Sequence, residues 1–133
     1  MLLDTSGLLA YLFANEPHHQ TAATLLEGAS HKVTHNYVFA ELVALATARK
    51  YPRRAVLGFL ADLLLHPQVS VIWVDRDLHA DAVALLEARP DKSYSLCDAV
   101  SFVVMLRHGT TSALTTDRHF EQEGFTRLLV AAD

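Results

Sequence analysis

Residues 95–117 read SLCDAVSFVVMLRHGTTSALTTD, and this stretch decides the fold class. Its first part, residues 95 to about 108, is strongly apolar and is predicted to be a buried helix, which Gly109 ends. Residues 113–115 are predicted to form a short strand, with Asp117 just beyond it. A buried helix that leads into a strand is the repeating unit of an α/β fold.

The same alternation of strands and helices extends along the chain on both sides of this stretch, and Asn36 is expected to cap the long third helix. Predicted strands cover residues 2–4, 32–34, 69–74, 113–115 and 127–130. Predicted helices cover about 6–15, 18–28, 36–50, 52–66, 75–88, 95–108 and 117–123. Strands separated by helices form a parallel sheet that is covered on both faces. We therefore predict a three-layer α/β/α fold with a short central parallel sheet of four to five strands, in a single domain over residues 1–133.

The composition narrows the possible classes of protein. With 133 residues, 51% of them hydrophobic, the chain is expected to bury roughly two thirds of its unfolded surface. Its apolar runs are too short to cross a bilayer, and no basic residue precedes the first run as in a secretory signal. Cys97 is the one cysteine, so neither an intrachain disulfide nor a cysteine zinc cage is expected. We predict a cytoplasmic protein that does not enter a membrane.

Four carboxylates stand where an apolar element meets a polar one: Asp4, Glu41, Asp98 and Asp117, here called the acidic quartet. In a parallel sheet the carboxyl ends of the strands and the starts of the following helices share one edge, and ligands bind there. Asp4 and Asp117 end predicted strands, whereas Glu41 and Asp98 lie in the first two turns of predicted helices. Acids gathered at one edge repel each other unless cations lie between them, so we predict a metal site.

Each acid also has a purely structural explanation. Ser95 and Asp98 have the spacing of a capping box, and Asp4 and Asp117 are possible helix N-caps. Glu41 is harder to explain in this way, because it is predicted on the apolar side of its helix, where an unpaired carboxylate is costly to bury. Its partner is either an arginine side chain or a cation from solution.

The net charge of −4 argues at first against a nucleic-acid partner. However, the chain has 15 acidic residues and 11 Lys plus Arg, so setting the quartet aside leaves 11 acids against 11 cations. Four of these cations lie within six residues and are candidate phosphate contacts: Arg49, Lys50, Arg53 and Arg54. The alternative is that they mark the end of one helix and the start of the next at Pro52.

Four motifs, taken in order, resemble the PIN domain. They are DTS at residues 4–6 after an apolar strand, Glu41 in a long helix, LCDA at 96–99 and TTDRHF at 115–120. In length and motif order the chain is similar, more narrowly, to the VapC group of toxin ribonucleases. The resemblance covers nearly the whole chain. It implies an endoribonuclease that depends on Mg²⁺ or Mn²⁺, forms a homodimer and is inhibited by a small cognate antitoxin. The basic residues at 49–54 would then be RNA contacts.

The resemblance also implies roles for individual residues. It makes the acidic quartet catalytic, with polar neighbours that would fix the carboxylates: Thr5, Ser6 and Thr116. Mg²⁺ and Mn²⁺ prefer oxygen ligands and make a bound water easier to deprotonate. We expect Asp4 and Asp98 to bind metal directly, Asp117 to bind or position a second ion or water, and Glu41 to orient the attacking water. Some family members carry a further acid where this chain has His119.

Two other functions remain open from the residues alone. The first is a phosphohydrolase or phosphotransferase that uses Asp4 as nucleophile. The second is a binding module without catalysis, whose acidic pocket holds a structural ion or recognises a basic peptide. The run DTSG at residues 4–7 also matches the aspartic protease signature, but those enzymes are all-β, whereas this chain is predicted to be mainly helical.

Overall fold

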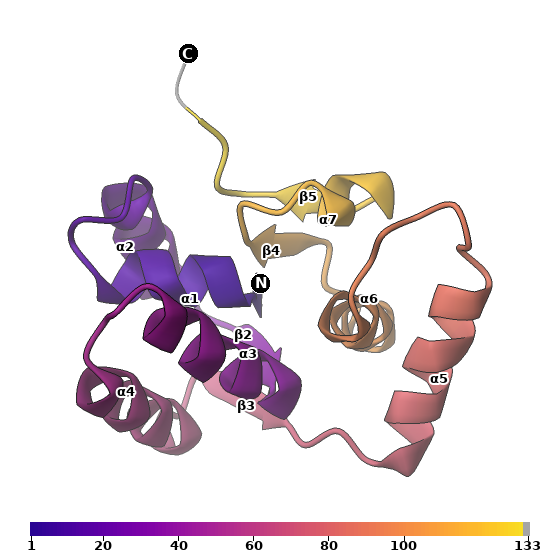
Figure 1. Ribbon diagram of the computed structural model, residues 1–133, viewed down its shortest axis with the longest axis horizontal. Coiled ribbons are helices and arrows are strands. Elements are labelled where there is room, and N and C mark those ends of the chain that lie inside the picture. Colours follow the sequence, from indigo (N-terminus) through magenta and orange to yellow (C-terminus); the bar gives the residue numbers. More distant parts are fainter. Residues whose placement is uncertain (132–133) are drawn as a thin grey trace.

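The computed structural model describes residues 1–131 and has the predicted α/β architecture (Figure 1). Five parallel strands form one sheet in the order β3-β2-β1-β4-β5. The strands are β1 (Leu2–Leu3), β2 (Lys32–His35), β3 (Val69–Ile72), β4 (Ser112–Leu114) and β5 (Thr126–Arg127). The helices are α1 (Thr5–Leu12), α2 (His19–Gly28), α3 (Asn36–Ala48), α4 (Arg53–Leu65), α5 (Arg76–Glu87), α6 (Leu96–His108) and α7 (His119–Gln122).

The sheet separates two apolar cores, because neighbouring strand residues point to opposite faces. Leu3 and Leu114 pack into the core made with α1 to α4, whereas Leu2 and Ala113 pack into the core made with α5 and α6. In Figure 1 these two groups of helices lie on opposite sides. The prediction of a three-layer α/β/α fold is thus confirmed.

The strand order places the candidate site. β1 is central and pairs with β2 on one side and with β4 on the other. The chain adds β2 and β3 on one side of β1 and then β4 and β5 on the other, so the strand order reverses at β1. A crevice opens beyond the carboxyl ends of the strands at such a point, where α/β proteins bind ligands. Asp4 follows β1 directly, and Asp117 lies three residues beyond β4.

Helix α1 starts immediately after Asp4 and runs very close to β4 at Gly7. A Cβ atom added to Gly7 would lie 2.0 Å from the carbonyl oxygen of Leu114. Only glycine allows this approach, because any side chain would push the helix away from the strand. The contact brings the start of α1 against the end of β4, which are the two segments that carry Asp4 and Asp117.

One capping prediction is confirmed and another is wrong. Helix α6 has the predicted capping box of Ser95 and ends at Gly109, whose φ of 64° is left-handed. The predicted cap by Asn36 is wrong, because α3 begins at Asn36 with His35 as its N-cap. The Asn36 side chain instead accepts a hydrogen bond from the Val74 amide at 2.6 Å. It therefore ties the chain beyond β3 to the start of α3.

Several element bounds also differ from the prediction. The strand predicted at 69–74 ends at Ile72, and the strand predicted at 127–130 is β5, Thr126–Arg127. Within residues 1–131, no helix combines the length and the apolar character needed to cross a membrane.

Candidate active site

Asp4 lies at the centre of the site and is almost fully buried, with 4% of its surface exposed. Its Oδ2 accepts a hydrogen bond of 2.7 Å from the Thr115 hydroxyl. Among the described residues, the buried Oδ1 of Asp4 and the buried hydroxyl of Thr5 have no hydrogen-bond partner. The pKa of Asp4 is raised to about 7, chiefly by burial; the charges of Asp98 and Glu41 add to the shift, whereas the Thr115 hydrogen bond opposes it. A buried carboxylate oxygen without a partner, close to two other acids, is suited to a cation.

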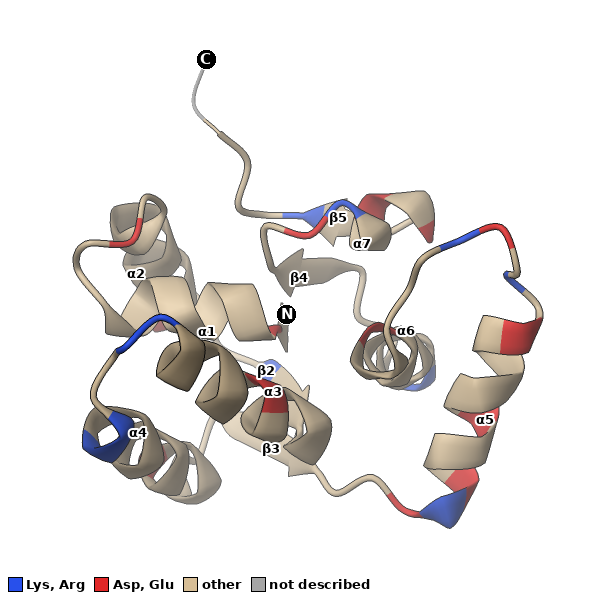
Figure 2. Ribbon diagram, in the orientation of Figure 1, with Lys and Arg blue, Asp and Glu red and all other residues tan. Residues whose placement is uncertain are grey.

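Glu41 reaches the same place from α3. A carboxylate oxygen of Asp4, one of Glu41 and the sulfur of Cys97 all lie within 4.8 Å of one another. Burial raises the pKa of the Cys97 thiol far above its usual value, and the charges of Glu41, Asp4 and Asp98 add to the shift. The thiol is therefore neutral and does not add charge to the acids around it. Figure 2 shows red segments at the end of β1, on α3 and at the start of α6 gathered at the centre of the view.

Asp98 has the structural role predicted for it and also faces the other acids. Its backbone amide donates to the Ser95 hydroxyl, and its Oδ2 accepts from the Ser95 amide, both at 3.0 Å. The same Oδ2 is 2.9 Å from Nδ1 of His119. Both hydrogen bonds that the described residues make to this carboxylate involve Oδ2. The capping box thus fixes the carboxylate at the start of α6 and leaves Oδ1 for another ligand.

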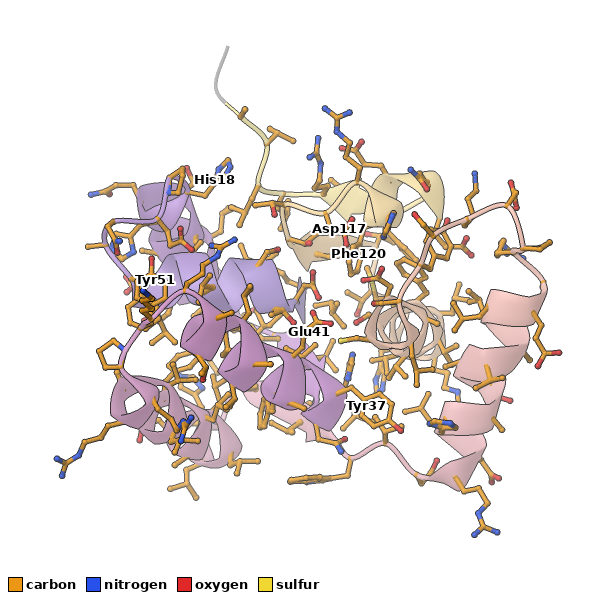
Figure 3. All side chains as sticks on the ribbon, in the orientation of Figure 1. His18, Tyr37, Glu41, Tyr51, Asp117 and Phe120 are labelled. Carbon is orange, nitrogen blue, oxygen red and sulfur yellow. The ribbon has the colours of Figure 1, made fainter. Side chains whose placement is uncertain are left out.

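His119 joins Asp98 to Asp117. Its Nδ1 is 2.9 Å from Oδ2 of Asp98 and 3.4 Å from Oδ1 of Asp117. Because an ionised carboxylate only accepts hydrogen bonds, Nδ1 carries the proton, and Nε2 lies 3.2 Å from the Ser93 hydroxyl. The sequence pointed to His119 as the residue that replaces an acid, and it did not predict this link between two carboxylates. In Figure 3, Glu41 approaches this region from α3 and Asp117 from the connection beyond β4.

A chain of hydroxyl groups connects the ends of β1 and β4. Thr115 donates to Asp4, and its oxygen accepts from the Asp117 amide at 3.0 Å. Ser6 and Thr115 hydroxyl oxygens are 3.2 Å apart, and Ser6 is the donor because the Thr115 proton points to Asp4. The Ser6 oxygen accepts from the Thr116 amide at 3.0 Å. Sequence reasoning had named Thr5, Ser6 and Thr116 as the polar neighbours and had missed Thr115, the residue that contacts Asp4. The Thr5 hydroxyl takes no part in this chain.

Replacing Thr115 by valine is expected to disturb the site without changing its shape. The change leaves Oδ2 of Asp4 and the Asp117 amide without a partner, which costs about 1–3 kcal/mol of unfolding free energy. It is also expected to lower metal affinity or activity roughly 10- to 100-fold. Calorimetric metal titration and urea unfolding measure the two effects. The control is Thr126→Val, which makes the same change at an exposed position of β5. Equal effects of the two substitutions would contradict the role of Thr115.

The basic run at 49–54 spans the turn between α3 and α4, as the helix-end explanation predicted, although Pro52 is the N-cap of α4. Lys50 has a left-handed φ of 62°, and Arg53 and Arg54 are exposed at the start of α4. Arg49 differs from them, since its guanidinium pairs with Glu16 and lies beside a pocket near Ser6. Figure 2 shows these basic segments together at one side of the view.

The model of the PIN domain family matches residues 1–125 of the chain. The chain belongs to the PIN domain family. This PIN domain is 33% identical over 129 residues to the 23S rRNA-specific endonuclease VapC20 of Mycobacterium tuberculosis, covering 96% of this chain and 97% of that protein. It is 31% identical over 127 residues to Ribonuclease VapC26 of the same organism, covering 90% of this chain and 89% of that one.

The fold of this PIN domain is also that of a solved relative. The crystal structure of M. tuberculosis VapC20, described as a sarcin-ricin loop cleaving toxin, matches with a TM-score of 0.85 and 32% sequence identity. The match covers 94% of this chain and 95% of that one. The predicted resemblance to the PIN domain and to its VapC group is confirmed.

The residues around Asp4 fit a divalent ion. PIN-domain nucleases use divalent metals, and among residues 1–131 two groups of side chains lie close enough together to hold one. The first joins Asp4 and Glu41 with the neutral thiol of Cys97, and the second joins Asp98 and Asp117 with His119. Because Nδ1 of His119 carries a proton, the two carboxylates would be the ligands in the second group. Carboxylate oxygens dominate both groups, as hard divalent cations require. Because Oδ1 of Asp4 is buried without a hydrogen-bond partner, the first group has the greater need of a cation.

Proposed function

We propose that this protein is a divalent-metal-dependent endoribonuclease and the toxin of a VapBC-type toxin–antitoxin pair. The observation that carries the proposal is the buried carboxylate of Asp4 at the carboxyl end of β1, which has one oxygen without a hydrogen-bond partner and lies close to Glu41 and Asp98. The relatives named as endonuclease and ribonuclease support RNA as the substrate. The same relatives support a cognate antitoxin as partner.

The four carboxylates of the acidic quartet would have different roles in binding metal and activating water. Asp4, Asp98 and Asp117 would hold Mg²⁺ or Mn²⁺. When bound, such an ion neutralises charge on the attacked phosphate and makes a water easier to deprotonate. Glu41 would orient that water and accept its proton.

The surrounding side chains would hold the quartet in place. Thr115 fixes one oxygen of Asp4, and the Ser95 amide and His119 fix one oxygen of Asp98. In each carboxylate the other oxygen would be left for the metal. The neutral Cys97 thiol would keep water away from the side of the cluster that faces the core.

We further propose a homodimer and a cytoplasmic location. Large apolar side chains are exposed on α4 and beyond β3, and they support a protein contact there: Leu57, Leu64, Leu65 and Trp73. The single buried cysteine is compatible with a reducing compartment.

The test of the proposed function is cleavage of structured RNAs by the purified protein with Mg²⁺, with Mn²⁺ or with excess EDTA. We expect cuts that require metal and disappear in Asp98→Asn. Asparagine keeps an oxygen that accepts the Ser95 amide, so the variant is expected to stay folded, and circular dichroism checks this. Cleavage that persists in excess EDTA, or that Asp98→Asn leaves unchanged, would overturn the proposal. The choice between Mg²⁺ and Mn²⁺ follows from the relative rates.

A further inference from the structure

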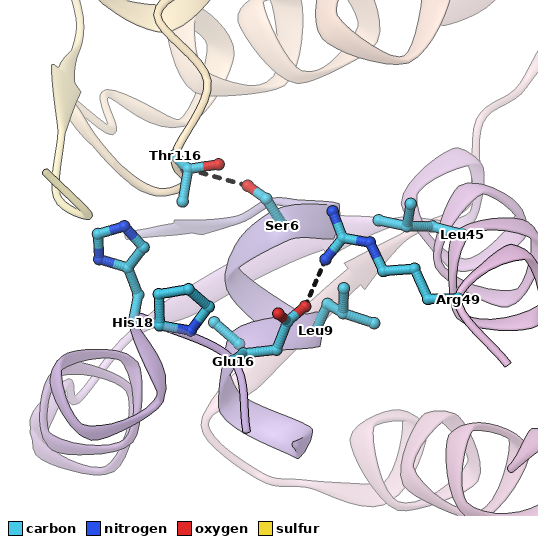
Figure 4. Close-up of a pocket in the computed structure, with 9 residues that line it drawn as sticks. Ser6, Leu9, Glu16, His18, Leu45, Arg49 and Thr116 are labelled. Atoms are coloured by element: carbon cyan, nitrogen blue, oxygen red, sulfur yellow. Dashed lines mark hydrogen bonds and ion pairs between the residues drawn. The ribbon is translucent and has the colours of Figure 1, made fainter. Parts of the chain in front are cut away.

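A pocket of about 340 Å³ is lined in part by Ser6 and Thr116, which are sequence neighbours of Asp4 and Asp117 (Figure 4). Leu9 of α1 and Leu45 of α3 form its apolar wall, and Ser6 and Thr116 form the side nearest the quartet. The volume is in the range of pockets that bind small organic groups. Two hydrogen bonds in series connect the pocket to the site, because Ser6 bonds to Thr115 and Thr115 bonds to Asp4. A group held in this pocket would therefore lie next to the reacting phosphodiester.

The pocket also contains a charged pair that the proposed catalysis does not use. Glu16, in the connection between α1 and α2, accepts a hydrogen bond from Nη1 of Arg49 at the end of α3. The Glu16 side chain is 12% exposed and that of Arg49 is 51% exposed. Within residues 1–131, the second carboxylate oxygen of Glu16 accepts no hydrogen bond. A largely buried carboxylate with a free oxygen is suited to accept hydrogen bonds from a ligand.

We propose that this pocket binds one unpaired guanine of the RNA, next to the cleaved bond, and that Glu16 and Arg49 recognise it. The inference rests on the proposed function and adds its base preference. Proteins read single-stranded RNA by placing an extruded base against flat or apolar side chains and hydrogen-bonding its edge. His18 also lines the pocket, and in Figure 4 its ring lies to the left of the Glu16–Arg49 pair.

Guanine fits this pair best, because it is the one RNA base with two different donor groups side by side on its Watson–Crick edge. A carboxylate only accepts hydrogen bonds, whereas a guanidinium only donates them. Guanine presents two adjacent donors, the ring N1–H and the exocyclic amino group, and beside them the O6 acceptor. Glu16 would take the donors and Arg49 the acceptor. Uracil offers one ring N–H between two carbonyl groups, so its carbonyl oxygens would face the Glu16 carboxylate.

A basic peptide side chain is the other conceivable occupant, but the charges favour a base. Arg49 already offsets the charge of Glu16, so a second cation would gain little there. A neutral base needs no further counter-charge, and its faces would contact the apolar walls formed by Leu9 and Leu45.

The test compares binding of labelled heptauridylates whose central residue is guanosine, inosine or uridine, measured by fluorescence anisotropy with Mg²⁺. All proteins carry Asp98→Asn to prevent cleavage, and they contain Glu16, Glu16→Gln or the control Glu87→Gln, which changes an exposed acid of α5. With Glu16, guanosine is expected to bind about 10-fold more tightly than inosine, which lacks the amino group, or uridine. Glu16→Gln is expected to remove most of this difference, and Glu87→Gln to leave it intact.

Equal affinity for the three RNAs, or equal weakening of all three by Glu16→Gln, would overturn the base site. Binding of an arginine-containing peptide that depends on Glu16, without a base preference, would assign the pocket to a basic segment and also overturn it. A failure of the proposed function would be seen separately from a failure of the base site. Guanosine-selective binding by a wild-type chain that cuts no RNA would support the pocket and reject the nuclease, whereas cleavage without base-selective binding would do the reverse.

Discussion

Asp4→Asn is expected to abolish metal-dependent RNA cleavage and, in the absence of metal, to make the protein more stable at pH 8. The activity should fall by about 10³-fold, because the change removes a charged ligand from the buried centre of the site. The gain in stability arises because the metal-free protein no longer has to bury this charge. Without metal, the wild-type protein must bury the Asp4 charge beside two other acids, and asparagine removes that charge while keeping an acceptor for the Thr115 hydroxyl.

The direction of the pH effect follows from the raised pKa of Asp4. Its value in the folded protein is about 7, compared with 3.8 for an unperturbed group. Between these values the Asp4 carboxyl of the unfolded chain has released a proton that the folded chain still holds, so the contribution of Asp4 to the free energy of unfolding falls as the pH rises from about 4 to 7. The full difference is about 4 kcal/mol. This loss should be absent in Asp4→Asn.

Urea unfolding in EDTA at pH 5 and pH 8 measures this effect. The matched control is Asp62→Asn, which removes an exposed acid of α4 and should keep the wild-type pH dependence. Adding Mg²⁺ or Mn²⁺ at pH 8 should stabilise the wild-type protein and not Asp4→Asn, because a ligand stabilises the state that binds it. Buried His35, whose pKa is lowered to about 4, contributes the opposite trend in both proteins, so the comparison between them isolates Asp4. An equal change in stability between pH 5 and pH 8 in the wild-type protein and in Asp4→Asn would contradict the buried, repelled carboxylate.

Gly7→Ala is expected to destabilise the protein by at least ~3 kcal/mol, although alanine is the better helix former. The added Cβ would lie 2.0 Å from the Leu114 carbonyl oxygen and 2.8 Å from the Leu114 side chain. Helix α1 would have to move away from β4. Because Asp4 precedes that helix and Ser6 lies in its first turn, the hydrogen bonds that join these two residues to Thr115 should weaken, namely the bond that Asp4 accepts and the bond that Ser6 donates. Cleavage should therefore fall with stability.

The comparison with Gly58→Ala separates the steric effect from helix propensity. Gly58 lies in the middle of α4, and nothing lies within 4 Å of the position a Cβ would take. There the same substitution should stabilise by about 0.5–1 kcal/mol. Thermal unfolding measures the stability of both variants. If Gly7→Ala failed to fold while Gly58→Ala folded, this would also support the steric effect. Equal stability of Gly7→Ala and the wild-type protein would contradict the close approach of α1 to β4.

Much of the fold was predictable, because it depends on patterns that are local in the sequence. The apolar run of 96–108, the Ser95 capping box and Gly109 define α6 with little help from the rest of the chain. The cap at Asn36 was mispredicted because its side chain bonds to Val74, a residue 38 positions away. The lengths of β3 and β5 depend on pairing with neighbouring strands, which the sequence alone does not supply.

The candidate site was predictable to the same extent. Parallel topology sends the ends of β1 and β4 and the starts of α3 and α6 to one edge, so the position of the quartet follows from the order of the elements. The contacts of Thr115, Cys97 and His119 do not follow from it. Each depends on the direction of a side chain and on how closely two elements pack.

The sequence by itself determined the class of this protein. The alternation of strand and helix patterns predicted a parallel sheet, and the order of the four motifs in the chain indicated the family. Both kinds of information are carried by residue type and spacing. Only the tertiary structure decided which oxygen of Asp4 lacks a partner, that His119 joins two acids, and that Glu16 and Arg49 meet beside Ser6. These contacts join residues that are far apart along the chain, and packing forces over distances of a few ångströms bring them together.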